Sequence, residues 1–296
     1  MPTHSRHLQW GAGAWWGAFL TADWFPFAGT CARPAVMNRT GLTVVLVIAA
    51  ATGGAFGAFA QLDLQISGWF FDPQAREFAL NRLIGLGHHA WLGTARDVSM
   101  WVVAALAAPP VLALIVKLVR PQLPLVIPGR TIVYLLLTLA LAPGVMANGI
   151  LKDHWGRSRP IDVIDFAGTD RFVPWWDPRG DCPQNCSFVS GESSGAFWAL
   201  APASLAPAHL RPLAYGAVVV FGTAVGMLRV AFGGHFFSDV VFAGVFTFLI
   251  VWLVHGLVYR SMASLFSDEA IERAIERLAP PLGRMRAAPA SKIQKV

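Results

Sequence analysis

The sequence predicts an all-α, multi-pass membrane helical bundle with about six transmembrane helices. The composition is the first indication: of 296 residues, 55% are hydrophobic and only 14% are charged, whereas soluble domains carry about 25% charge. The second indication is a series of apolar runs of about 20 residues, the length that crosses a bilayer. The six runs are residues 41–61, 99–119, 131–151, 190–208, 214–232 and 236–258.

Three of these runs contain residues that weaken a helix. A proline pair at 109–110 interrupts the second run and Pro143 interrupts the third. Membrane helices tolerate such breaks when neighbouring helices cover the freed backbone groups. The fourth run begins with polar residues, Ser190 and Glu192 among them, so it has the least support of the six.

Lysine and arginine indicate the orientation, because they gather in cytoplasmic segments. With the N-terminus inside, fourteen of the 23 Lys and Arg residues fall on the inner side and nine on the outer side. Lys152 is the only lysine outside the cytoplasmic segments, which favours a functional role for it. The net charge of +6 is concentrated at the chain ends, so it indicates membrane topology and not a nucleic-acid partner.

The chain divides into three parts. Residues 1–36 form an uncertain N-terminal extension with four Trp residues. It is either dispensable, because Met37 offers a second possible start, or an interfacial Trp-rich arm. Residues 37–260 form the membrane domain. Residues 261–296 form a basic cytoplasmic tail, in which a helix after Ser267 is expected to be solvated or to lie on the membrane surface.

Two outer segments are expected near the mouths of the helices. Residues 62–98 contain an aromatic, amphipathic run that we expect in the interface beside the site, with a plain connecting loop as the alternative. The loop at 161–189 either caps the site or is structural. Its Cys182 and Cys186 can form a disulfide in an oxidising compartment, or remain free thiols. Zinc would need further ligands, and no clustered metal-ligand pattern is present.

The turn between the fifth and sixth runs is the most unusual stretch of the chain. It contains Arg229, His235 and Asp239, which are costly beside apolar helices unless they serve a purpose. His235 and Asp239 are four residues apart, so on a helix they share a face. The Asp can then hold one imidazole nitrogen and leave the other free to attack. Arg229 offers a planar fork of donors suited to phosphate. Alone, these residues also fit a helix-terminal ion pair.

Two further pieces decide between these interpretations. Lys152 and Arg159-Pro160 follow the third run, and Ser190-Gly191 opens the fourth. Together the motifs form K-x6-RP, then SG, then R-x5-H-x3-D. This order and spacing resemble the type 2 phosphatidic acid phosphatase superfamily, which includes membrane lipid phosphatases, bacterial acid phosphatases and vanadium haloperoxidases. The resemblance covers about 90 residues, and the hydrophobic pattern fits the membrane branch over much of the rest.

The resemblance implies a phosphatase without cofactor or metal, whose active site lies on the outer face. His235 would attack phosphorus and form a phosphohistidine, while Asp239 would orient it and stabilise its charge. Cations and N–H donors must surround a phosphate dianion. The residues expected to bind phosphate are Lys152, Arg159, Ser190, Gly191 and Arg229.

Two positions depart from the family pattern. Glu192 stands where the family usually has a His that protonates the leaving group, and Leu228 stands where a Ser usually precedes the Arg. Glu192 can act as the acid, as a base that activates water, or as a structural partner of a Lys or Arg. His88, His89 and His154 are possible substitutes for the missing His, although each also fits an interfacial or loop position.

The expected substrate is a membrane lipid with a phosphate at the outer interface. The layout looks most like the lipid A phosphatases of the bacterial inner membrane, with the active site facing the periplasm. Undecaprenyl pyrophosphate, phosphatidylglycerol phosphate and phosphatidic acid are alternative substrates. Two rival functions share the same residues: a lipid phosphotransferase, and a catalytically impaired lipid-binding protein. The sequence indicates no oligomeric state.

Overall fold

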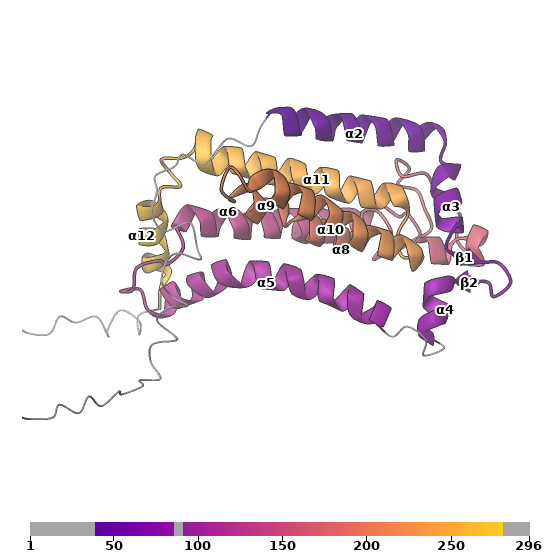
Figure 1. Cartoon of the computed structure of the whole chain (residues 1–296), viewed down its shortest axis with the longest axis horizontal. Helices are drawn as coiled ribbons and strands as arrows, with labels where there is room; N and C mark the ends of the chain where they lie inside the picture. The colour runs from indigo at the N-terminus through magenta and orange to yellow at the C-terminus, as the bar shows by residue number, and fades with distance from the viewer. Residues whose placement is uncertain (1–38, 86–90, 281–296) are drawn as a thin grey trace, which may run out of the picture. The chain divides into compact units, whose positions relative to one another are not determined.

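The described part of the chain is mostly helical with almost no strands, as the sequence predicts. The computed structural model describes residues 39–85 and 91–280, so the N-terminal extension, His88, His89 and the end of the tail lie outside the described residues. Five helices in the described part are long and apolar enough to cross a membrane. Figure 1 shows them side by side. They are α2 (Arg39–Ala58), α5 (Trp91–Val119), α6 (Gly129–Leu139) with its continuation, α10 (Arg211–Ala231) and α11 (Phe237–Gly256).

Two of these helices continue as irregular turns. After α6, the chain runs on as the π-helical segment η1 (Ala140–Leu151) and the short helix α7 (Lys152–His154) without leaving the helix axis. Helix α11 ends in a second π-helical turn, η4 (Leu257–Ser261). The prolines that interrupt the sequence pattern lie inside α5 and η1, so both helices accommodate them.

The fourth predicted span is not a single helix. Residues 190–208 form two short helices, α8 (Gly191–Phe197) and α9 (Leu200–Ser204), which are largely buried. Pro202 explains the break, because a proline ring clashes with the carbonyl four residues earlier, here that of Trp198. The described residues therefore contain five long apolar helices and one broken helix, in place of six equal spans.

Helix α8 packs closely between α10 and α11. A Cβ at Gly222 of α10 would lie 2.5 Å from the Phe197 ring, and one at Gly244 of α11 would lie 3.1 Å from it. Small residues allow membrane helices to approach in this way. Ser194 is also hydrogen-bonded to Thr247 of α11 at 2.8 Å. These contacts fix the middle and the end of α8 relative to both neighbouring helices.

The segment after α2 forms a small folded unit at one end of the spanning helices (Figure 1). It consists of α3 (Gln61–Gly68), a hairpin of β1 (Phe71–Asp72) and β2 (Glu77–Phe78), and α4 (Ala79–Gly85). The Phe78 ring is fully buried and packs with Val163, Phe166 and Phe236. The short turns η2 (Pro160–Asp162) and η3 (Ile164–Phe166) complete this cluster. The segment thus contacts both the 161–189 loop and the start of α11.

The tail helix α12 (Asp268–Leu278) lies at the opposite end and is docked on the membrane helices (Figure 1). Its Ile271 and Ile275 are buried. Lys117 of α5 is 3% exposed and binds Glu272 at 2.6 Å and Glu276 at 2.8 Å. Its amphipathic face and the buried lysine therefore attach α12 to α5 and α6, so the helix is not fully solvated, and its position on the membrane surface stays a prediction.

Candidate active site

The three sequence motifs meet at the end of the bundle where α3 and the hairpin lie. Lys152 ends the long α6–η1–α7 helix, and Arg159 follows it in a loop. Arg229 occupies the last turn of α10, and His235 stands in the turn before α11. Lys152, Arg159 and Arg229 all act electrostatically on His235, so the three cations surround this imidazole.

His235 is 2% exposed, and within the described residues its ring makes one hydrogen bond. Its Nδ1 lies 2.7 Å from the carbonyl oxygen of Ser187, and since a carbonyl can only accept, Nδ1 carries the proton. The other nitrogen, Nε2, therefore keeps its lone pair in the neutral ring. Burial lowers the pKa of His235 well below its usual value, and the charges of Arg229, Lys152 and Arg159 lower it further.

Asp239 does not hold His235 as expected. Helix α11 begins at Phe237, so His235 precedes the helix and the four-residue spacing does not bring the two side chains together. The Asp239 carboxylate instead accepts from the Phe236 amide at 2.9 Å and from the Ser187 hydroxyl, and it pairs with Arg157. Its connection to His235 is indirect, through Ser187, whose hydroxyl binds Asp239 and whose carbonyl binds the imidazole.

Arg157 and Asp63 form a buried charge network that the sequence reasoning did not single out. The Arg157 side chain is fully buried and donates to Asp63 of α3 at 2.8 Å, to Ser238 at 2.9 Å, and to Asp239. Asp63 in turn accepts from the Ser238 amide at 3.0 Å and from its hydroxyl at 2.6 Å. Two features of the sequence could have indicated this network: Asp63 directly follows an apolar span, and Arg157 lies inside the K-x6-RP motif.

Glu192 pairs with Arg229. Its Oε2 lies 3.0 Å from Nε of Arg229, and both side chains are mostly buried. The sequence left open whether Glu192 would bind a lysine or an arginine, and Arg229 is the partner observed. Glu192 also acts electrostatically on Lys152, so its carboxylate lies among the cations of the site.

Ser190 and Gly191 shape the start of α8. The Ser190 hydroxyl accepts from the amide of Ser193 at 3.3 Å and from its hydroxyl at 2.8 Å, which makes Ser190 the N-cap. Gly191 lies directly against Oδ1 of Asn148 in η1, and a Cβ there would clash with this atom. Asn148 cannot easily turn away, because its amide donates to the Pro143 carbonyl at 2.6 Å.

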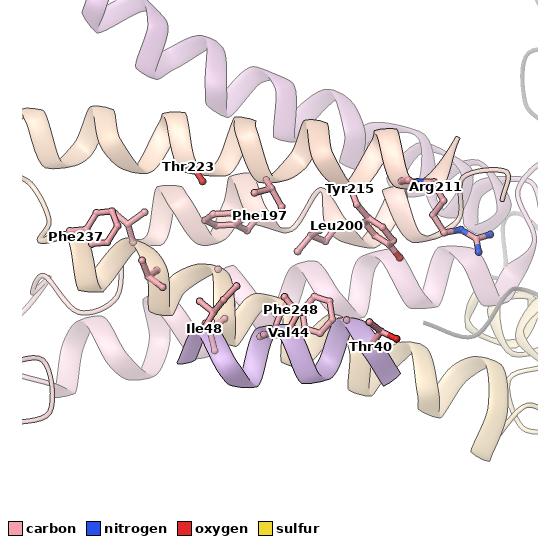
Figure 2. Close-up of a pocket in the computed structure, with 18 of the residues that line it drawn as sticks. Thr40, Val44, Ile48, Phe197, Leu200, Arg211, Tyr215, Thr223, Phe237 and Phe248 are labelled. Atoms are coloured by element: carbon pink, nitrogen blue, oxygen red, sulfur yellow. The ribbon is translucent and has the colours of Figure 1, made fainter. Parts of the chain in front are cut away.

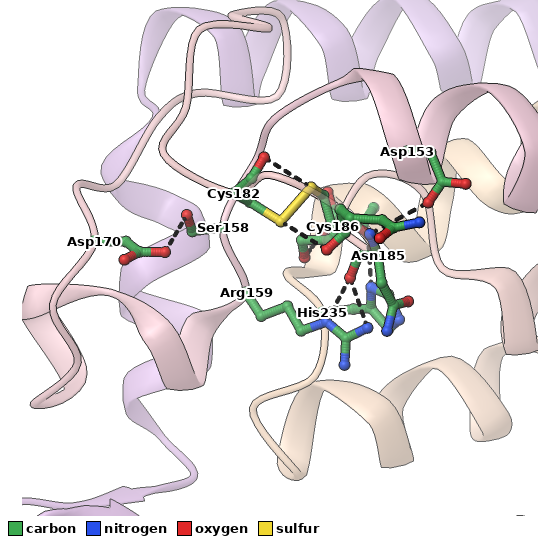
Figure 3. The surroundings of a disulfide bond; sticks show 11 residues. Asp153, Ser158, Arg159, Asp170, Cys182, Asn185, Cys186 and His235 are labelled. Atoms are coloured by element: carbon green, nitrogen blue, oxygen red, sulfur yellow. Dashed lines mark hydrogen bonds between the residues drawn. A yellow bond between two sulfur atoms is a disulfide. The ribbon is translucent and has the colours of Figure 1, made fainter.

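Arg159 is held by the loop that carries the two cysteines (Figure 3). Its Nε and one terminal nitrogen both donate to the Asn185 carbonyl, at 3.2 and 2.8 Å. Cys182 and Cys186 form a disulfide bond that closes this loop. Arg159 thus takes its position from Asn185, a residue 26 positions further along the chain.

Of the three histidines proposed as substitutes for the missing His, only His154 lies among the described residues. His154 is exposed, and its Nδ1 lies 2.9 Å from the carbonyl of Ile150, one turn earlier in its own helix. Among residues 39–85 and 91–280, no three His, Cys, Asp or Glu side chains gather in a way that could hold a metal ion. The arrangement offers basic side chains near one imidazole, which suits nucleophilic attack on a bound phosphate.

Comparison with known proteins identifies the family. Residues 131–263, which include every motif above, match the PAP2 superfamily. The chain is 35% identical over 206 residues to the lipid A 4'-phosphatase of Francisella tularensis subsp. novicida (strain U112), covering 69% of this chain and 90% of that protein. The chain belongs to the PAP2 superfamily. Its sequence resemblance to this superfamily is thereby confirmed.

Two further PAP2 relatives are more distant. The lipid A 4'-phosphatase of Rhizobium leguminosarum is 32% identical over 139 residues, covering 47% of this chain and 56% of that protein. That of Rhizobium etli is 32% identical over 138 residues, covering 47% and 51%. No solved structure matches the chain. Family membership and the spanning helices make this chain a multi-pass membrane phosphatase of the PAP2 superfamily, a hydrolase of phosphoric ester bonds.

Proposed function

We propose that this PAP2 protein hydrolyses the 4'-phosphate of a lipid A-like glycolipid through a phosphohistidine intermediate, without a metal ion. The observation that carries the proposal is the environment of His235, whose Nε2 keeps its lone pair among Lys152, Arg159 and Arg229. The three relatives compared above are lipid A 4'-phosphatases, which suggests the lipid.

In the first step, the phosphate binds the three cations and the amide of Gly191, which begins α8. Nε2 of His235 attacks phosphorus in line, an N–P bond forms, and the P–O bond to the sugar breaks. The electron pair of that bond stays on the sugar oxygen, which takes up a proton and leaves as a hydroxyl group. The cations stabilise the charge of the transferring phosphoryl group, the task that a metal ion performs in other phosphatases.

Glu192 is the proposed donor of that proton. Its partner Arg229 is also a phosphate-binding cation, so the incoming dianion competes with the carboxylate for the guanidinium. A carboxylate that loses this partner and faces a phosphate dianion favours its protonated form. Substrate binding would therefore prepare Glu192 to act as the acid, in place of the usual His.

In the second step, water attacks the phosphohistidine, the N–P bond breaks, and inorganic phosphate leaves. The electron pair of that bond returns to Nε2, and the ionised Glu192 accepts a proton from the water. His235 is neutral again and Glu192 is protonated, as in the substrate complex; when phosphate leaves, Glu192 releases this proton to water and pairs with Arg229 again. Asp239 acts at a distance in this scheme, because it supports Ser187, whose carbonyl keeps the imidazole in the reactive tautomer.

An apolar cavity of about 730 Å³ supports a lipid substrate (Figure 2). It lies between α2, α10 and α11 and is lined almost entirely by apolar side chains. One end is marked by Phe237, two residues from His235, and the other by Thr40 and Arg211. We propose that an acyl chain occupies this cavity while the head group lies at His235. A soluble sugar phosphate would have no use for it.

We further propose that the protein lies in the bacterial inner membrane with the active site facing the periplasm. The excess of Lys and Arg in the opposite segments favours this orientation. The disulfide bond near Arg159 agrees with it, because such bonds persist in oxidising compartments such as the periplasm.

The test is phosphate release by the purified full-length protein in detergent, with a chelator present and no metal added. Lipid A, undecaprenyl pyrophosphate, phosphatidylglycerol phosphate and phosphatidic acid are compared as substrates. We expect lipid A to have the highest kcat/KM and mass spectrometry to show loss of the 4'-phosphate. A higher kcat/KM for another lipid would overturn the proposal of a lipid A-like substrate. Strict dependence on magnesium would overturn the proposal of a metal-independent mechanism. Phosphate on an added alcohol acceptor, in place of free phosphate, would identify a phosphotransferase.

A further inference from the structure

The guanidinium of Arg159 depends on one acceptor for its position. Both Nε and a terminal nitrogen donate to the carbonyl oxygen of Asn185, at 3.2 and 2.8 Å. In the part of the chain that the structure describes, no carboxylate forms a salt bridge with Arg159. A long, partly exposed side chain of this kind has many rotamers, so a fixed acceptor decides where its free donors point.

The Asn185 carbonyl is in turn fixed by the disulfide loop. The bond between Cys182 and Cys186 closes a five-residue loop whose Cα atoms are 5.7 Å apart at its ends. Asn185 has φ of 56°, the left-handed conformation, which turns its peptide toward the site. Figure 3 shows the bond beside Asn185 and Arg159, with His235 close by.

The same loop is anchored to the first motif at three more points. The Cys186 amide donates to the Lys152 carbonyl at 2.7 Å, and the Cys182 amide donates to the Gly156 carbonyl at 3.1 Å. The Asn185 amide lies 3.3 Å from the Asp153 carboxylate. The loop thus runs along the whole K-x6-RP segment and links its lysine end to its arginine end.

We propose that the Cys182–Cys186 loop is the positioning device for Arg159, and that its disulfide bond sets the affinity of the site for phosphate. This inference rests on the proposed function in one respect, the role of Arg159 as a phosphate ligand. Asn185 is a positioning residue through its main-chain carbonyl and has no contact with the reacting atoms in the proposed mechanism.

Reduction of the bond gives a direct way to release the loop. The sulfur of Cys182 belongs to a partly exposed residue, so a dithiol reductant can attack it. Two thiol–disulfide exchanges transfer two electrons to the bond; each cysteine sulfur gains a proton, and the dithiol leaves as its own cyclic disulfide. Freed of its closure, the loop no longer fixes the Asn185 carbonyl, and Arg159 loses its position.

The experiment measures the dissociation constant of inorganic phosphate, and kcat/KM for lipid A, before and after treatment with dithiothreitol. For the wild-type protein we expect both to worsen by about tenfold to a hundredfold, the scale of a misplaced binding group, and to recover on reoxidation. The Cys182→Ser/Cys186→Ser variant should resemble the reduced protein with or without dithiothreitol. Because this variant keeps Cys31, it also reveals any effect of the reductant that acts through that residue.

Arg159→Ala separates a positioning role from a general structural one. If the loop acts through Arg159, this variant binds phosphate weakly and dithiothreitol weakens it no further. Two results would overturn the inference: dithiothreitol weakens phosphate binding of Arg159→Ala by the same factor as in the wild-type protein, or it leaves the phosphate affinity of the wild-type protein unchanged. If lipid A is still hydrolysed, the proposed function stands in either case. If reduction weakens phosphate binding but no lipid is hydrolysed, the inference stands and the proposed function is overturned. Failure to bind phosphate in either state would overturn both.

A second perturbation leaves the disulfide intact. Asn185→Val places a β-branched residue in the left-handed conformation, which it strongly disfavours, so the carbonyl should turn away and phosphate affinity should fall. Asn185→Gly tolerates this conformation and should lose less. Gln184→Val, at an exposed position of the same loop, is the matched control and should leave affinity unchanged. Equal effects at 184 and 185 would contradict the role of the Asn185 carbonyl.

Discussion

Arg157 and Asp239 form a fully buried ion pair at the start of helix α11. The second carboxylate on Arg157 is that of Asp63 in α3, so one guanidinium joins the segment after α2 to the turn that carries His235, the proposed nucleophile. The Arg157 guanidinium also lies over the Phe236 ring at 4.4 Å. The network therefore ties the turn before α11, which carries His235, to α3 and to the loop after α7.

The first prediction concerns this network. Arg157→Met keeps much of the volume but leaves two buried carboxylates facing each other without a cation. Removal of one partner from a buried ion pair typically costs about 3–5 kcal/mol, so the midpoint of thermal unfolding in detergent should fall by several degrees. Arg179→Met is the control, because Arg179 is 80% exposed and its substitution should change the midpoint little. Equal midpoints for the two variants would show that Arg157 contributes no net stability.

The second prediction concerns the nucleophile. His235→Ala should lower turnover by at least about 1,000-fold, because no other imidazole described here lies at the phosphate site. Wild-type protein quenched in alkali during turnover of a radiolabelled substrate should retain label on His235, which peptide mapping can locate. His154→Ala removes an exposed histidine and should keep full activity. Normal phosphate release by the His235 variant would end this assignment.

The third prediction concerns pH. His235 must be neutral to attack, so activity is lost as pH falls through the pKa of His235 in the free enzyme. Burial and the charges of Arg229, Lys152 and Arg159 hold that pKa well below 6.5, so the histidine limb of kcat/KM should lie well below pH 6.5. Arg159→Met removes one of these charges and should move the limb toward higher pH.

Comparison between variants is needed here because the substrate phosphate also titrates near pH 6. Arg171→Met, which removes an exposed arginine from the same loop, should leave the limb in place. If both variants give the wild-type profile, the limb belongs to a group other than His235.

The fourth prediction concerns Glu192. Glu192→Gln keeps the shape but loses the proton donor, so phosphorylation of His235 should slow by about 100- to 10,000-fold for an alkoxide leaving group. The loss should be smaller for leaving groups that depart unprotonated, such as p-nitrophenolate or the phosphate of a pyrophosphate. Turnover is plotted against leaving-group pKa, and the variant should give the steeper line.

The alternative role of Glu192 gives a different plot. If it serves only to hold Arg229, the Gln variant weakens phosphate binding equally for every leaving group, and the two lines are parallel. Glu192→His then provides a check: partial recovery with a shifted acidic limb supports proton donation, since the reference pKa of His is about 6.5.

The sequence predicts that the chain spans a membrane and that the three motifs share one site, because both follow from patterns along the chain and need no knowledge of side-chain contacts. Apolar length gives the spanning helices, and three motifs with fixed spacing identify residues that must share one site. The partner of Asp239 could not be predicted in this way. The i, i+4 rule applies only within a helix, and the sequence does not reveal that α11 begins after His235.

The long-range contacts were equally beyond the sequence. Asp63 and Arg157 are 94 residues apart, and no local pattern pairs them. Pro202 could have indicated the break between α8 and α9, but prolines at 109–110 and 143 lie inside helices that remain intact. Whether a proline ends a membrane helix depends on what surrounds it, which only the fold supplies.

The docked helix α12 sets the size of the smallest stable fragment. The superfamily match ends at residue 263, but a chain cut there would lose Glu272 and Glu276, the two carboxylates that bind the ammonium of Lys117. It would also remove the helix whose Ile271 and Ile275 are buried against the rest of the chain. The physical boundary of the domain therefore lies near Pro280, beyond the region in which the family can be recognised.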